Sequence, residues 1–410
     1  MHEHAHVNSQ AKLYTHRPKK RYKIKINSVL GTSLLGSTTT VVNIAVNTLY
    51  LYSATQSPSM TKLHASILLA LTILTSPHAW TNNADNAVIL LYHHVSSTTP
   101  ASTSVTPAVF EQHLQHLADG YKVISLEQAV KALKAGELLP ERAVVITFDD
   151  GYRNIYDNAH PMLLKYAMPY TVFVNPQLIG KHSHQLNWQQ VAEMEKGGAQ
   201  FANHTSHHRH LLERAAGASL AEWLDEIEQD IVQANALLDD KLASNPPYVA
   251  YPYGEFNTDI QNLVATLGMV GFGQHSGGIY SGSDFTALPR FPAAGIYGNL
   301  RTLKTKINSL AMPVTSSSVS DPVVQPGSVG GFSFTFAGED VIAQQMGCYY
   351  ANEALPVSVD GYTVTVTWDK TLPIGRSRVN CTAPSRAQPG RYYWYSQPWF
   401  VADRNGKYPD

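Results

Sequence analysis

The sequence is short of charge, and its few charges nearly cancel. Charged residues make up 15% of the 410 residues, and the formal net charge is −1. Such a chain has no electrostatic attraction for nucleic acid or for an acidic membrane surface, so we expect neither as a partner. Hydrophobic residues amount to 44%, and the chain is long enough to fold into two globular domains.

Cysteine is also scarce. The two cysteines, Cys348 and Cys381, both lie near the C-terminus. A disulfide between them would therefore staple one small region and leave the rest of the chain to hydrophobic packing. We expect this disulfide to form if the protein reaches an oxidising compartment.

The N-terminal part of the chain lacks a clear membrane span. The stretch Val29–Tyr52 contains too many threonines and asparagines for a span of ~20 apolar residues. The stretch that starts at Met60 has the pattern of a signal peptide: a charged end, a short apolar run and a small-residue cleavage site at Ala79. We expect residues 1–59 to be a non-native or disordered extension and residues 60–79 to be cleaved near Ala79, which gives a secreted or periplasmic protein. The alternative is an upstream stretch that is retained as a membrane anchor.

The remainder divides into two regions by its periodicity. Strand and helix patterns alternate over residues 80–312, which is typical of parallel strands joined by crossover helices and predicts an α/β fold of the distorted (β/α) barrel type. Residues 313–328 are rich in serine, proline, valine and glycine and predict a linker. Period-two alternation without helical patterns then predicts a small antiparallel β-sandwich-like domain at residues 329–410.

One apolar run ends in a pair of acids. Residues 144–148 are β-branched or aromatic, and Asp149, Asp150 and Gly151 follow them directly. Buried strands end at the rim of a sheet, where ligands bind, and two adjacent carboxylates need a positive partner there. A metal ion held by one carboxylate, with the other left as a base, satisfies this need. The alternative is a simple turn followed by a helix cap.

A histidine-rich tract supplies further metal ligands. His204 and His208 are four residues apart, a spacing that aims two imidazoles at a single ion. With Asp150 they make a set of three ligands with an open position, as hydrolytic metal centres have. His207 and His210 belong to the same tract, so spacing alone leaves the choice among these histidines open, and such tracts also occur as solvated surface.

Three motifs in this order resemble the polysaccharide deacetylase family, the NodB-homology carbohydrate esterases. They are Thr147–Gly151, His204-Thr205 with His208, and Tyr251–Glu255, and the resemblance covers about residues 87–292. The resemblance implies that Asp149 is the general base and that Asp150, His204 and His208 are the metal ligands. It also implies that the backbone amide of Tyr253 donates to the oxyanion. A metal-bound water would be the nucleophile, and zinc is the expected ion because it suits two imidazoles and a carboxylate, with cobalt, nickel and iron as alternatives.

Two departures from the family pattern concern its other catalytic groups. Many members carry an arginine shortly before the third motif, where this sequence has none, so we expect Arg290 to pair with Asp149 instead. Members usually place a Leu-x-His segment late in the domain. Here Tyr92-His93 ends an early strand, an order that resembles the periplasmic poly-N-acetylglucosamine deacetylases of biofilm systems. This makes His93 the expected general acid and His275 its rival.

The expected substrate is an acetylated polysaccharide. We expect Trp188, Tyr251, Pro252 and Tyr253 to line a sugar groove, although Trp188 fits the core of its helix equally well. The sequence thus predicts a metal-dependent hydrolase that removes N-acetyl groups from an N-acetylhexosamine polymer of the chitin, peptidoglycan or poly-N-acetylglucosamine type. The alternatives are an O-acetyl esterase on xylan and a glycan-binding protein without activity. A free base at Asp149 argues against the last.

Overall fold

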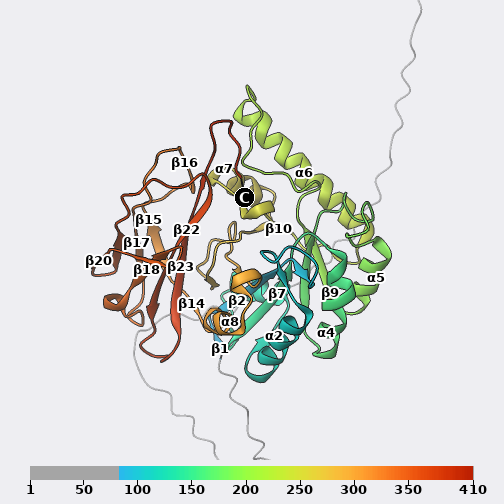
Figure 1. The fold of residues 1–410 in the computed structure, drawn as a ribbon, viewed down its shortest axis with the longest axis horizontal. Helices are drawn as coiled ribbons and strands as arrows, with labels where there is room; N and C mark the ends of the chain where they lie inside the picture. The colour runs from blue at the N-terminus through green and yellow to red at the C-terminus, as the bar shows by residue number, and fades with distance from the viewer. Residues whose placement is uncertain (1–82, 410) are drawn as a thin grey trace, which may run out of the picture. The chain divides into compact units, whose positions relative to one another are not determined.

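The computed structural model describes residues 83–409 (Figure 1). The predicted extension and signal peptide, residues 1–59 and 60–79, lie outside the described residues. Across the described part of the chain, no helix combines the length and the apolar character that crossing a membrane requires.

A nine-stranded sheet forms the centre of the first region. Along its main path the strands follow the order β11 (Val270–Phe272), β10 (Tyr248–Ala250), β9 (Ala199–Asn203), β8 (Tyr170–Val174), β7 (Ala143–Phe148), β2 (Ala87–Tyr92) and β12 (Gly278–Ile279). Two more strands join it, β13 (Phe291–Pro292) beside β2 and β5 (Lys122–Val123) beside β7. All pairs are parallel except β12 with β2. The sheet is a curled half-barrel, which confirms the predicted distorted (β/α) barrel.

Strands β2 and β7 consist almost wholly of apolar residues because both faces of this sheet are covered. Every residue of β2 and of β7 is buried, and the strands pair in register from Ala87 with Ala143 to Tyr92 with Phe148. A run of apolar side chains without alternation is what burial on both faces requires. Thr147, the polar exception, donates its hydroxyl hydrogen bond to the carbonyl of Leu90 at 2.7 Å.

Helices lie between the strands along the chain and flank the sheet in Figure 1. They are α2 (Pro107–Gly120), α3 (Leu126–Lys134), α4 (His160–Lys165), α5 (Trp188–Lys196), α6 (Leu220–Lys241), α7 (Thr258–Thr266) and α8 (Leu300–Ile307). The longest of these helices, α6, begins with a capping box: Ser219 and Glu222 each accept from the other's backbone amide.

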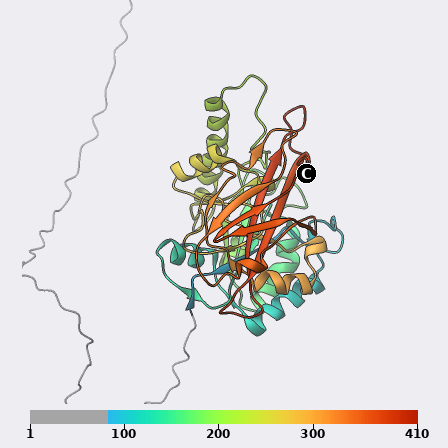
Figure 2. The ribbon, with the colours of Figure 1, turned by 90° about the vertical axis from the view of Figure 1, so that its left-hand side faces the viewer.

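Two β-sheets make up the second region, seen in orange and red in Figure 2. The larger sheet contains β14 (Leu310–Ala311), β16 (Val323–Val324), β18 (Gly347–Tyr350), β19 (Glu353–Leu355), β22 (Gly375–Pro384) and β23 (Tyr392–Val401). The smaller contains β15 (Val314–Ser317), β17 (Phe332–Phe336), β20 (Val357–Asp360) and β21 (Thr363–Val366). Alternate residues of β17 are buried in the core of this region, as the period-two pattern predicts.

The segment predicted as a linker, residues 313–328, belongs to these sheets. Strand β15 pairs with β17, and β16 pairs with β23 in parallel. The prediction failed because β15 is an edge strand whose residues stay exposed or half-buried, so it needs no apolar alternation. The parallel pairing of β14 and β16 with β23 also makes the larger sheet mixed rather than wholly antiparallel.

The two regions share a hydrophobic cluster. Phe400 and Tyr408 of the second region pack with Tyr251, Phe256 and Ile260 of the first. The Phe256 and Phe400 rings lie 5.7 Å apart between centroids. The β-sheets are therefore packed firmly against the end of the α/β sheet that carries β10.

Cys348 and Cys381 form a disulfide between β18 and β22. Closing this loop of 33 residues restricts the unfolded chain, so replacing both cysteines by alanine should lower the free energy of unfolding by about 3 kcal/mol. Urea unfolding monitored by tryptophan fluorescence measures this. Reductant should destabilise the wild type similarly and leave the double variant unchanged; an equal response of both proteins would contradict the prediction.

Candidate active site

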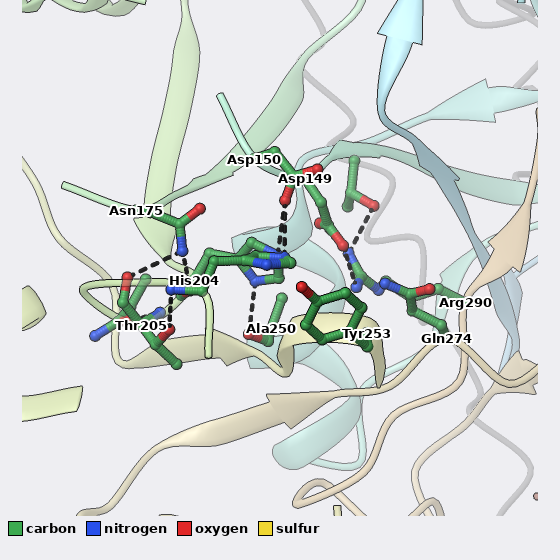
Figure 3. A network of polar contacts seen from close by, with 12 residues as sticks. Asp149, Asp150, Asn175, His204, Thr205, Ala250, Tyr253, Gln274 and Arg290 are labelled. Atoms are coloured by element: carbon green, nitrogen blue, oxygen red, sulfur yellow. Dashed lines mark hydrogen bonds and ion pairs between the residues drawn. The ribbon is translucent and has the colours of Figure 1, made fainter. Parts of the chain in front are cut away.

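The carboxyl ends of the parallel strands meet at one edge of the sheet. Asp149 and Asp150 follow β7, His204 follows β9, and His93 follows β2. Backbone hydrogen bonds continue just beyond the strands: the Asp149 amide donates to the carbonyl of Tyr92, and the His204 amide donates to that of Val174. Asp149, Asp150 and His204, which follow different strands, are thereby brought to one place (Figure 3).

The backbone at this edge is strained. Asp150, Thr205, His208 and Tyr253 all have positive φ angles, of 70°, 63°, 55° and 58°. Non-glycine residues in the left-handed region each cost on the order of 1 kcal/mol and cluster at functional sites. Gly151 also has a positive φ, and a Cβ there would lie 2.9 Å from a methyl of Val174, so glycine is needed after the two acids.

Asp150, His204 and His208 form a set that fits a metal ion. One carboxylate oxygen of Asp150 lies 3.2 Å from Nε2 of His204 and 3.1 Å from Nε2 of His208. One ligand atom from each residue falls within 4.8 Å of the others. The Asp150 Oδ1 and His204 Nε2 atoms are buried without a hydrogen-bond partner, which is unfavourable unless a further group binds them.

The His204 ring is oriented by its other nitrogen. Its Nδ1 donates to the carbonyl of Ala250 at 2.8 Å, which leaves the Nε2 lone pair directed toward Asp150. Burial raises the pKa of the Asp150 carboxyl, but the adjacent His204 and His208 rings outweigh burial and hold that pKa well below its usual range. An ionised carboxylate and an imidazole with its lone pair directed inward are the forms that ligate metals.

Asp149 is turned away from this set and toward Arg290, as Figure 3 shows. Arg290 donates to both carboxylate oxygens, with Nη1–Oδ1 at 2.7 Å and Nη2–Oδ2 at 2.8 Å, and neither side chain is exposed. Arg290 also donates from Nε to the carbonyl of Gly273, and its guanidinium lies 5.2 Å from the centre of the Phe173 ring. Burial raises the pKa of the Asp149 carboxyl, but the charges of Arg290 and His204 outweigh it and lower that pKa below its usual value.

The two candidate acids have different surroundings. Burial lowers the pKa of His93, while the charges of Asp150 and Asp149 act against this, so His93 lies within electrostatic reach of both acids. Burial and the charges of Arg378 and Arg290 lower the pKa of His275 to about 3. Burial thus lowers the pKa of both rings, and what distinguishes His93 is that it directly follows β2 and lies within electrostatic reach of Asp149 and Asp150, whereas His275 lies near Arg378 and Arg290.

The other two histidines of the tract bind acids outside the cluster. His207 Nδ1 lies 2.9 Å from an oxygen of Asp230, and His210 Nδ1 lies 2.8 Å from an oxygen of Glu255. The His210 ring stacks on the Tyr253 ring at 3.7 Å between centroids. Spacing alone did not distinguish these histidines from His204 and His208.

The predicted substrate-binding residues are only partly placed at the site. Tyr253 is half-buried next to His208, with ring centroids 4.6 Å apart. Tyr251 is fully buried and donates its hydroxyl to the carbonyl of Thr286, so the prediction that it lines a groove is wrong: packing of its ring in the core takes it away from substrate. Pro252 is also buried, so its predicted place in the groove is wrong for the same reason. Trp188 packs partly buried against the core, and its contact with sugar stays a prediction.

Sequence reasoning missed Asn175, which supports the histidine segment. Its side-chain amide donates to the backbone carbonyls of His204 and Thr205, the latter at 3.1 Å (Figure 3). Asn175 directly follows strand β8, so its position as a polar residue at the end of a buried strand was the available signal.

Comparisons with known proteins point to one family. The family model described as polysaccharide deacetylase matches residues 137–272, which include Asp149, Asp150, His204 and His208 but neither His93 nor Arg290. The chain is 32% identical over 196 residues to the poly-beta-1,6-N-acetyl-D-glucosamine N-deacetylase of Staphylococcus epidermidis, covering 43% of this chain and 67% of that protein. The Escherichia coli strain K12 protein of the same name is 27% identical over 220 residues, covering 45% of this chain and 33% of that protein.

A Bacillus subtilis relative is 33% identical over 172 residues, and the chain spans 58% of its length. The curated relatives are thus matched over only part of their own length. Among solved structures, the Streptococcus pyogenes deacetylase PplD in complex with acetate aligns with a TM-score of 0.49 and 28% identity, covering 54% of this chain and 98% of that chain.

Metal binding is tested with His204→Ala and His208→Ala. Each variant removes one imidazole from the set, so zinc affinity measured by isothermal titration calorimetry should fall by roughly 100-fold or more. His207→Ala is the matched control, because its ring faces Asp230, and it should bind zinc as the wild type does. Equal affinity in His204→Ala and His207→Ala would contradict the assignment.

The pairing of Arg290 with Asp149 is tested by a double-mutant cycle. Arg290→Met leaves a buried carboxylate without its partner, so the free energy of unfolding at pH 7 should fall by about 3–5 kcal/mol. Adding Asp149→Asn removes the stranded charge and should recover more than half of that loss in the same urea titration. Strictly additive losses would mean that the two side chains do not interact.

Proposed function

Since this chain belongs to the polysaccharide deacetylase family, we propose that it hydrolyses N-acetyl groups of a polymer of β-1,6-linked N-acetylglucosamine. The family model covers the residues of the proposed centre, and the named relatives from Staphylococcus epidermidis and Escherichia coli carry the activity in their names. The observation that carries the proposal is the juxtaposition of the Asp150, His204 and His208 set with Asp149, which is held apart from it by Arg290.

Asp150, His204 and His208 would hold a divalent metal ion. Zinc is the ion that two imidazoles and one carboxylate suit, and cobalt, nickel and iron accept the same ligands. When bound, such an ion polarises the acetamide carbonyl and lowers the pKa of water. His208 is the most exposed of the three side chains, at 22%, so substrate would approach from its side.

Asp149 serves as the general base. Its lowered pKa keeps it ionised at neutral pH, so it is ready to accept the proton of the attacking water. Arg290 binds both of its oxygens and thereby fixes the orientation of the carboxylate without needing to move during the reaction. A carboxylate bound in this way is also kept from joining the metal ligands.

The remaining steps need a donor to the carbonyl oxygen and an acid. The backbone amide of Tyr253 is the proposed donor, since its residue lies beside His208 in a strained turn. His93 is the proposed acid that protonates the departing amine, because it lies within reach of the charges of Asp149 and Asp150. Both roles are carried by backbone or side chains at the same sheet edge.

We further propose that the protein acts outside the cytoplasm. The disulfide between Cys348 and Cys381 supports this, because such bonds persist in oxidising compartments. Outside the cytoplasm the protein would have access to extracellular polysaccharide.

Substrate class is tested by measuring acetate release from β-1,6-linked N-acetylglucosamine oligomers, chitooligosaccharides and acetylated xylan. The proposal expects fastest release from the β-1,6-linked oligomers and loss of release with a chelator, restored by zinc. Faster release from acetylated xylan would instead identify an O-acetyl esterase. Binding of all three without release would identify a glycan-binding protein.

The base is tested with Asp149→Asn, which keeps the shape of the side chain but removes its proton affinity. Turnover of the preferred oligomer should fall by roughly 10²–10⁴-fold, while zinc affinity stays unchanged because Asp149 is not in the ligand set. Asp157→Asn, at an exposed acid paired with Arg153, is the control and should keep full turnover. Wild-type turnover in Asp149→Asn would refute its role.

A further inference from the structure

A contact from the second region reaches the turn that carries the proposed oxyanion donor. Arg376, the second residue of β22, donates from Nη1 to the backbone carbonyl of Tyr253. The same nitrogen donates to the side-chain oxygen of Gln274 at 3.1 Å. One guanidinium thus joins the larger β-sheet to two segments of the α/β region, and 123 residues separate it from Tyr253.

The turn at Tyr253 needs such support because its backbone is strained. Tyr253 has a φ of 58° and Gly254 a φ of 71°. A Cβ at Gly254 would lie 2.6 Å from Cβ of Gln274, so the turn is pressed against that residue. Strained conformations of this kind persist only when neighbouring groups over-determine them.

The ring of Tyr253 is held as well as its carbonyl. The His210 ring stacks on it with an angle of 2° between the planes, and His210 is itself anchored to the buried Glu255. Figure 3 draws Tyr253 in the same network as His204 and Gln274, and Gln274 shares the Arg376 donor with the Tyr253 carbonyl. His210 thus holds the ring of Tyr253 and Arg376 holds its carbonyl, which leaves the turn little freedom.

The strand that carries Arg376 is packed against the α/β region. Phe400, paired with Arg376 in the ladder between β22 and β23, is buried against Phe256 of the α/β region. Lys407 also forms an ion pair with Glu213, which follows the histidine tract. The packing fixes the start of β22 close to the catalytic edge.

We propose that Arg376 is a positioning residue for the catalytic centre, and that the second region is thereby part of the enzyme rather than an appendage. Arg376 holds the Tyr253 carbonyl so that the turn presents the Tyr253 amide to the acetamide oxygen; this step rests on the proposed function. Misplacement of an oxyanion donor affects the transition state more than substrate binding, so the effect belongs in kcat rather than in KM.

The test compares Arg376→Ala with Arg376→Lys and with the control Arg386→Ala. Arg386 also donates to a backbone carbonyl, that of Glu339, but within the second region. With the oligomer on which the wild type is most active, Arg376→Ala should lower kcat by about tenfold or more and leave KM within about twofold. Arg376→Lys keeps one donor and should recover part of kcat, and Arg386→Ala should match the wild type.

Hydrogen–deuterium exchange of the peptide spanning residues 251–256 gives a second readout that needs no substrate. Exchange there should be faster in Arg376→Ala than in wild type and Arg386→Ala, with unchanged zinc affinity. Unchanged kcat or unchanged exchange in Arg376→Ala overturns the inference, as does a rise in KM alone. If Arg376→Ala does not fold, the same comparisons are made with Arg376→Gln. A wild type that releases no acetate contradicts the proposed function, and the exchange result then still decides whether Arg376 holds the turn.

Discussion

The buried ion pair between Arg290 and Asp149 is the interaction on which the candidate active site depends. Neither side chain is exposed, so each charge is tolerable only because the other is present with two short hydrogen bonds. The pair separates the two neighbouring acids by function, since Asp149 is engaged by Arg290 while Asp150 faces His204 and His208. Two adjacent carboxylates thereby avoid competing for one metal ion.

Arg290 also links distant strands. It immediately precedes β13, which pairs with β2, and it donates to the carbonyl of Gly273 beyond β11. Placing the guanidinium under the Asp149 carboxylate therefore requires the whole curled sheet to form. The same hydrogen bonds therefore contribute to stability and to the orientation of Asp149, the proposed base.

The strained turns around the site extend this dependence to the rest of the molecule. Asp150, His208 and Tyr253 adopt left-handed backbone angles that non-glycine residues keep only at a cost, which surrounding contacts must offset. Asn175 restrains the segment after His204, and Arg376 restrains the turn at Tyr253. The α/β sheet supplies the proposed metal ligands, and contacts from outside the strands hold them in geometries that local sequence does not favour.

Individual elements show where sequence reasoning succeeded and where it failed. The strands β2 and β7 and the capping box of α6 were predictable because continuous apolar runs and local hydrogen-bonding residues act over a few positions. Strand β15 was mistaken for a linker because an exposed edge strand leaves no apolar pattern. Tyr251 was assigned to the substrate because a motif gives residue order but not the direction of a side chain, and its ring points into the core.

The sequence by itself determined the alternation of strands and helices in the α/β region and the three ordered motifs whose resemblance names the reaction class and implies Asp150, His204 and His208 as metal ligands. These follow from residue type and spacing along the chain, which are local properties. Arg290 was already expected as the partner of Asp149, but only the tertiary structure decided that two short hydrogen bonds join them, that His275 stands among positive charges, and that Arg376 reaches Tyr253. Those contacts join residues far apart in the chain, and their geometry exists only once the sheets have curled and packed together.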